Sequence, residues 1–117
     1  MSFVETEING QILTIRLNRP ERLNALSTVI RSGMAEAFNR FHEDNDLEVA
    51  ILTGTGRGFC AGEDMKESLD RGIPGSPKEF VEENLVDPFQ TGVLKKPVIA
   101  AVNGFAMGGG FMLVERT

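Results

Sequence analysis

The chain has 117 residues, of which 41% are hydrophobic and 25% charged, and its 12 basic and 17 acidic residues give a net charge of -5. This length and composition predict one globular domain over residues 1–117. The acidic balance, with no basic cluster longer than Lys95-Lys96, argues against a nucleic-acid partner, and no apolar run is long enough for a membrane span. The first ten residues lack the pattern of a secretory signal, so we expect a cytoplasmic protein.

The chain begins with two β-rich runs, at 3–8 and 11–17. Between them stands Asn9-Gly10, the preferred pair for a two-residue hairpin turn. In the second run Leu13, Ile15 and Leu17 alternate with residues of the opposite face. This period of two predicts a hairpin with one side against a core.

An amphipathic helix is predicted after Ser27, which suits a helix N-cap. Apolar residues then recur at spacings of three and four, at Ile30, Met34, Ala37, Phe38 and Phe41. The next apolar run, LEVAILT at 47–53, is typical of a strand buried on both faces of a parallel sheet. A strand, a helix and a strand in this order imply a right-handed crossover.

The second half of the chain is predicted to hold a short helix at 63–69, a Gly- and Pro-rich loop at 71–77 and a longer helix near 78–89. A further buried strand follows at 98–102. Cys60, the only cysteine, is typical of a small core residue, and His42 lies in a polar helical stretch where exposure is expected.

Two stretches share one pattern, VAILTGTGRGFCAGEDM at 49–65 and VIAAVNGFAMGGGFML at 98–113. Each has a strand, a glycine-containing turn and the start of a helix, where free amides favour an anion. Neither has the GxGxxG or GxxxxGK[ST] pattern, so a nucleotide site is weakly indicated. The glycines suit close packing of helix on strand, or one amide from each loop converging on one oxygen as an oxyanion hole.

Three segments in this order resemble the enoyl-CoA hydratase/isomerase, or crotonase, family: NRPERLNAL at 18–26, FCAGEDM at 59–65 and KPVIAAVNGFAMGGGF at 96–111. The resemblance covers essentially the whole chain but only the N-terminal half of a typical member. It implies an α/β fold of repeated ββα units, truncated before the C-terminal helical part. It also implies an acyl-CoA thioester substrate, with coenzyme A as part of that substrate, no permanent cofactor and no metal. Assembly as a homotrimer or hexamer, or with a partner segment that completes the fold, is expected.

The same resemblance implies that the amides of Ala61 and Gly109 form the oxyanion hole. The segment 21–23 is expected along the coenzyme A, with Arg22 near a phosphate or simply solvated. Glu63 either faces the acyl pocket or is a first-turn acid that complements a helix dipole, and Asp64 has a structural or pocket-shaping role. The expected substrate-binding residues are Glu21, Arg22, Leu23, Ala61, Glu63, Asp64, Met65 and Gly109.

Met112 departs from the family pattern. Members that hydrate a double bond typically carry a glutamate two residues after the three glycines, and here that position is Met112. A thioether neither accepts nor delivers a proton, so a two-glutamate hydratase is not expected. The resemblance implies a lyase or isomerase that stabilises an enolate. The alternative is a non-catalytic acyl-CoA-binding or assembly subunit of the same fold.

Overall fold

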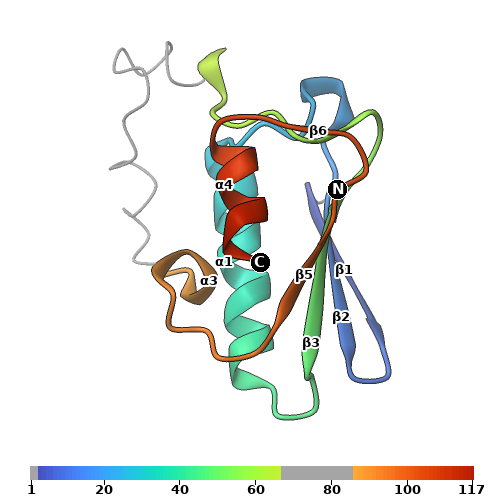
Figure 1. The fold of residues 1–117 in the computed structure, drawn as a ribbon, viewed down its shortest axis with the longest axis vertical. Helices are drawn as coiled ribbons and strands as arrows, with labels where there is room; N and C mark the ends of the chain where they lie inside the picture. Colours follow the sequence, from blue (N-terminus) through green and yellow to red (C-terminus); the bar gives the residue numbers. More distant parts are fainter. Residues whose placement is uncertain (1–2, 67–85) are drawn as a thin grey trace.

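A computed structural model describes residues 3–66 and 86–117 (Figure 1). Two sheets and the helices beside them make up this part of the chain. In chain order the elements are β1 (Val4–Asn9), β2 (Ile12–Leu17), the 3-10 helix η1 (Pro20–Arg22), α1 (Thr28–Glu43), β3 (Val49–Gly54), β4 (Gly58–Cys60), α3 (Pro88–Thr91), β5 (Val98–Ala101), β6 (Phe105–Ala106) and α4 (Gly109–Arg116).

The larger sheet has the strand order β1-β2-β3-β5, with α1 packed on one of its faces (Figure 1). β1 and β2 are antiparallel, whereas β2, β3 and β5 are parallel. The predicted crossover through a helix is therefore confirmed. β4 and β6 form a separate parallel pair. β1-β2-α1 and β5-β6-α4 follow a ββα order within the described residues. The two stretches of the predicted repeat, at 49–65 and 98–113, contain β3-β4 and β5-β6-α4.

The hairpin turn lies one residue later than predicted. Asn9 pairs with Ile12, so the two-residue loop is Gly10-Gln11. Gly10 has φ +62°, a left-handed conformation that glycine adopts without a steric penalty. The glycine therefore sits at the first loop position, and Asn9 completes the strand.

α1 forms as its sequence predicts. The Ser27 hydroxyl accepts a hydrogen bond from the Ile30 amide at 3.3 Å and so caps the first turn. At the other end, Lys96 Nζ donates to the carbonyl oxygens of Phe41 at 2.6 Å and Asp44 at 2.7 Å, where a cation complements the helix dipole. The predicted core residues of the helix are all buried, namely Ile30, Met34, Ala37, Phe38 and Phe41.

The apolar run at 47–53 was predicted to be a strand buried on both faces and the run at 98–102 a further buried strand, and both predictions are wrong in the extent of burial. Along β3, Ala50 and Leu52 are buried while their neighbours are only partly so. Along β5, Ile99 is 55% exposed. The reason is that α1 covers one face of the sheet, and within the described residues no helix covers the other.

The predicted loop at 71–77 lies outside the described residues, as do 67–69 of the first predicted helix and 78–85 of the second. Cys60 is buried and His42 is exposed, as expected. In the part of the chain that is described, no helix combines the length and apolar character needed to cross a membrane.

Asn24 is a buried residue whose side chain bonds to several backbone groups, a role that the sequence did not predict. Its Oδ1 accepts from the Arg19 amide at 2.7 Å. Its Nδ2 lies 3.0 Å from the carbonyl oxygen of Gly58 and 3.2 Å from that of Phe59, and it also contacts Thr55 O at 3.1 Å. Asn24 has φ +56°, a conformation that asparagine tolerates better than most residues. One side chain thus ties the loop after β2 to the turn between β3 and β4.

Asn103 holds the same turn from β5. Its Oδ1 accepts from the Gly54 amide at 3.1 Å, and its Nδ2 donates to Gly56 O at 3.0 Å and Gly58 O at 3.2 Å. The Gly58 carbonyl oxygen therefore accepts hydrogen bonds from the side chains of both Asn24 and Asn103. The start of β4 is fixed by polar contacts from two distant parts of the sequence.

Replacing Asn24 with glycine should lower the free energy of unfolding by about 2–4 kcal/mol, because buried carbonyl groups lose their partner. Glycine tolerates the positive φ, so the loss reports on the side chain alone. Asn45→Gly, at an exposed position after α1, should cost no more than about 0.5 kcal/mol. Urea unfolding measures both, and similar costs for the two variants would contradict the role of Asn24.

Candidate active site

The two glycine loops meet where β4 pairs with β6. Met107 N donates to Cys60 O at 3.1 Å. Beyond this bond, Gly62 lies against the second loop with φ +92°, and a Cβ there would stand 2.6 Å from Met107 O and 3.1 Å from Gly109 N. Only glycine allows this approach. The similarity of the two loops in sequence therefore corresponds to contact in space.

Each glycine of the triplet 108–110 has a structural reason. Gly108 has φ +52°, which a side chain would disfavour. A Cβ on Gly109 would stand 2.9 Å from Leu26 Cδ1, and one on Gly110 would collide with the carbonyl oxygen of Cys60. The close-packing interpretation is confirmed for Gly110. The triplet alone is thus not evidence for a ligand.

A cavity of about 470 Å³ opens beside the point where the loops meet. Three predicted residues lie together in its wall: Glu63, Gly109 and Met112. Four others were not predicted, and they come from α1, α3, α4 and the loop before α1. These four are Leu26, Arg31, Gln90 and Arg116. Leu26, Arg31 and Gln90 are far along the chain from both glycine loops, which left no signal that would have joined them to the site. Arg116 follows Met112 by four residues in α4, a helical spacing that could have placed it on the same face.

The Ala61 amide is engaged within the protein. It donates to Leu23 O at 3.0 Å, and Ala61 does not belong to the cavity wall. The same two segments are joined a second time, because Leu26 N donates to Gly62 O at 2.6 Å. Leu26 and Glu63 are thereby paired as in a parallel sheet. Glu63 therefore lies in an extended bridge and not in the first helical turn, which corrects the helix-dipole interpretation.

The segment 21–23 does not reach this cavity in the described chain. Arg22 Nη2 lies 2.9 Å from Asp64 Oδ1, and the Asp64 side chain is only 4% exposed. This ion pair ties η1 to the loop after β4, so Arg22 is neither simply solvated nor directed at the cavity. Glu21 and Met65 are exposed, and neither lines the cavity.

The cavity wall combines charged and apolar side chains. Arg31 Nη2 lies 3.2 Å from Glu63 Oε1, with both side chains about three-quarters buried. Met112, which also lines the cavity, is 48% exposed. Behind the wall, burial raises the pKa of the Cys60 thiol, against smaller opposing effects of the Gly62 backbone and the Arg31 charge. Within residues 3–66 and 86–117 no cluster of His, Cys, Asp or Glu could hold a metal.

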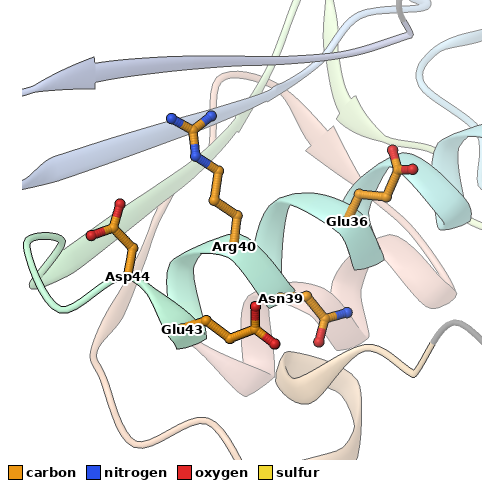
Figure 2. Close-up of a pocket in the computed structure, with 5 residues that line it drawn as sticks. All are labelled: Glu36, Asn39, Arg40, Glu43 and Asp44. Carbon is orange, nitrogen blue, oxygen red and sulfur yellow. The ribbon is translucent and has the colours of Figure 1, made fainter.

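A second hollow, of about 560 Å³, lies along α1 (Figure 2). Its wall consists of Glu36, Asn39, Arg40, Glu43 and Asp44, whose side chains point in different directions. Asn39 Nδ2 is bonded to the carbonyl oxygens of Ala35 and Val86. The hollow offers no converging groups and lies on a different part of α1 from the glycine loops, so it is the weaker candidate.

Comparison with known proteins gives the site its context. The enoyl-CoA hydratase/isomerase family model matches residues 7–116. The chain belongs to the enoyl-CoA hydratase/isomerase family. It is 36% identical to the 1,2-epoxyphenylacetyl-CoA isomerase of Escherichia coli, over 97% of this chain and 44% of that protein. It is 42% identical to the mevalonyl-coenzyme A hydratase of Aspergillus fumigatus, over 90% of this chain and 38% of the relative.

The fold comparison agrees with the family match. An enoyl-CoA hydratase structure from Mycobacterium tuberculosis superposes with a TM-score of 0.82 at 38% identity, and the match covers all of this chain and 44% of that one. The predicted crotonase-type fold is confirmed. The chain spans less than half the length of these relatives, as the resemblance to an N-terminal half predicted.

Replacing Gly110 with alanine should destabilise the protein by about 3 kcal/mol, because the new methyl group meets a backbone oxygen that cannot rotate away. Gly10→Ala is the matched control, since its Cβ meets nothing within 4 Å and only φ is strained. That variant should cost about 1 kcal/mol. Equal losses in thermal or urea unfolding would show that Gly110 is not packed against Cys60.

Cys60 should react slowly with a thiol reagent in the native protein. The thiolate is the reacting form, and burial disfavours it. Ellman's reagent at pH 8 should modify the unfolded chain rapidly and the native chain only as it opens. Fast native modification, at the rate of an exposed thiol, would contradict the buried position of β4.

Proposed function

We propose that the protein is an acyl-CoA-processing enzyme that binds a coenzyme A thioester beside Gly109 and stabilises an enolate there with two backbone amides. The observation that carries the proposal is the contact between the two glycine loops, which brings Gly109 and Glu63 into one cavity. The relatives support the substrate class, because an isomerase and a hydratase share coenzyme A in their names. They differ in the reaction.

The first proposed donor is the Gly109 amide. Gly109 is the first residue of α4, so its N–H has no carbonyl partner four residues earlier in the helix. The N-terminus of a helix also favours negative charge, as in a thioester oxygen that becomes an enolate. Gly109 thus combines position with suitable electrostatics.

The second proposed donor is the Glu63 amide, in place of the Ala61 amide that the family resemblance implied. Ala61 N already donates to Leu23 O. In the parallel bridge between Leu26 and Glu63, the Leu26 N–H bonds to a neighbour of Glu63, the carbonyl oxygen of Gly62, and not to Glu63 itself. In such a pairing the N–H and C=O of Glu63 point away from Leu26. Glu63 also lines the cavity, which Ala61 does not.

The proposed chemistry is that of a lyase or isomerase and not of a two-glutamate hydratase. Met112 lines the cavity at the position of the usual glutamate and cannot transfer a proton. Among the described residues of the cavity wall, Glu63 is the one carboxylate, and it is paired with Arg31. A non-catalytic acyl-CoA-binding subunit is not favoured, because the relatives compared above are named for reactions. Assembly as a homotrimer or hexamer stays a prediction of the resemblance.

Gly109→Pro tests the first donor. Proline suits the first position of a helix but has no N–H. Gly109→Ala is the matched control, since it adds a Cβ against Leu26 and keeps the amide. The measurement is deuterium uptake, from heavy water, at the carbon next to the carbonyl of butyryl-CoA.

The proline variant should exchange about 100- to 1000-fold more slowly than the alanine variant, which is the usual effect of removing one oxyanion donor. Equal rates in the two variants would contradict the role of the Gly109 amide. Binding without any exchange in the wild-type protein would instead contradict enolate formation.

A further inference from the structure

Among the described residues, the wall of the cavity beside Gly109 has more positive than negative charge, because Arg31 and Arg116 line it and Glu63 is the one acid. Arg31 Nη2 is paired with Glu63 Oε1 at 3.2 Å, so no acid among the described wall residues balances the Arg116 charge. The amide side chain of Gln90 adds a neutral polar group on the same cavity.

Arg116 is bound only weakly by its own helix. Its Nη1 lies 3.5 Å from Met112 O, at the long limit of a hydrogen bond. Beyond the wall, burial raises the pKa of the Asp87 carboxyl, and the Arg116 charge is among the smaller effects that oppose this. The carboxylate of Asp87, however, caps α3 by accepting from the amides of Phe89 and Gln90. A guanidinium has five N–H donors, and so Arg116 retains capacity for a ligand.

α4 directs three residues to this one cavity, Gly109, Met112 and Arg116. From Gly109 to Arg116 the helix makes about two turns, or roughly 10 Å along its axis. Helical side chains lean toward the N-terminus, so the guanidinium reaches back toward Gly109. A group bound by Arg116 would therefore lie a few bonds from a carbonyl held at Gly109.

We propose that the acyl group of the substrate carries a terminal carboxylate and that Arg116 binds it. This inference rests on the proposed function, because it takes the thioester carbonyl to lie at Gly109. Arginine recognises carboxylates with two parallel hydrogen bonds, and Gln90 adds a neutral donor beside it. A short dicarboxylic acyl chain, such as glutaryl, matches the spacing along α4.

The phosphates of coenzyme A are the other source of negative charge. They are separated from the thioester by the pantetheine arm, whereas Arg116 and Gly109 line one cavity of about 470 Å³. A cavity of this volume suits the acyl end of the ligand and not the whole of it. This favours the acyl carboxylate, and the experiment separates the two sources.

Calorimetric titration with glutaryl-CoA, hexanoyl-CoA and free coenzyme A tests the inference. The wild-type protein should bind glutaryl-CoA about tenfold more tightly than hexanoyl-CoA, as expected for a hydrogen-bonded ion pair. Arg116→Gln should remove that preference, because it should weaken glutaryl-CoA binding about tenfold more than hexanoyl-CoA binding. Circular dichroism checks that the variant is folded. Arg40→Gln, an exposed arginine on α1, should change neither affinity.

Three results would overturn the inference. Equal affinity of the wild-type protein for glutaryl-CoA and hexanoyl-CoA would contradict the inference directly, without reference to any variant. A loss in Arg116→Gln that is equal for both thioesters and for free coenzyme A would assign Arg116 to a phosphate. No binding of either thioester by the wild-type protein would overturn the proposed function itself, and the inference with it.

Discussion

The position of the candidate site depends on the pairing of two very short strands, β4 and β6. The bond from Met107 N to Cys60 O joins the chain before α4 to the loop after β4. Gly110 then packs on the same Cys60 carbonyl, and Gly62 packs on the amide of Gly109. These contacts are between backbone atoms, so they tolerate almost no added volume. The distance between the two loops is therefore fixed by backbone contacts and not by side chains.

This small pair is stabilised from outside by two asparagines. Asn24 and Asn103 come from loops on either side of the turn 54–58, and both donate to Gly58 O at the start of β4. Below them, the cap at Ser27 and the apolar face of α1 fix the helix on the larger sheet. α1 in turn places Arg31 beside Glu63. The polar contacts of the loops and the apolar core thus together fix the positions of the residues that line the cavity.

Local patterns were enough to predict much of this fold. The spacing of Ile30, Met34 and Phe38 predicted α1, and the repeated strand-glycine-helix pattern predicted that the two loops are related. The burial of β5 was overestimated, because an apolar run does not reveal whether a second layer covers it. Strands as short as β4 and β6 have too few residues for a detectable period.

The wall of the site was harder to predict than the fold. A motif identifies a loop but not which of its amides turns toward the cavity. Here the hydrogen bond from Ala61 N to Leu23 O is the observation that leads us to propose the Glu63 amide in its place. Arg31 lines the cavity through the packing of α1, for which its sequence neighbourhood carries no signal, whereas the spacing of four residues between Met112 and Arg116 could have indicated a shared helix face. Long-range contacts of this kind follow from the assembled fold alone.

The central claim is that backbone amides at the meeting point of the two loops polarise a thioester carbonyl. Infrared difference spectroscopy of butyryl-CoA labelled with ¹³C at that carbonyl tests the claim most directly, because the stretching frequency falls when hydrogen bonds draw charge onto the oxygen. We predict a lower frequency for the bound thioester than for the free one, and a smaller shift in Gly109→Pro than in Gly109→Ala. A bound thioester whose carbonyl frequency equals that in water, or is higher, would contradict the account.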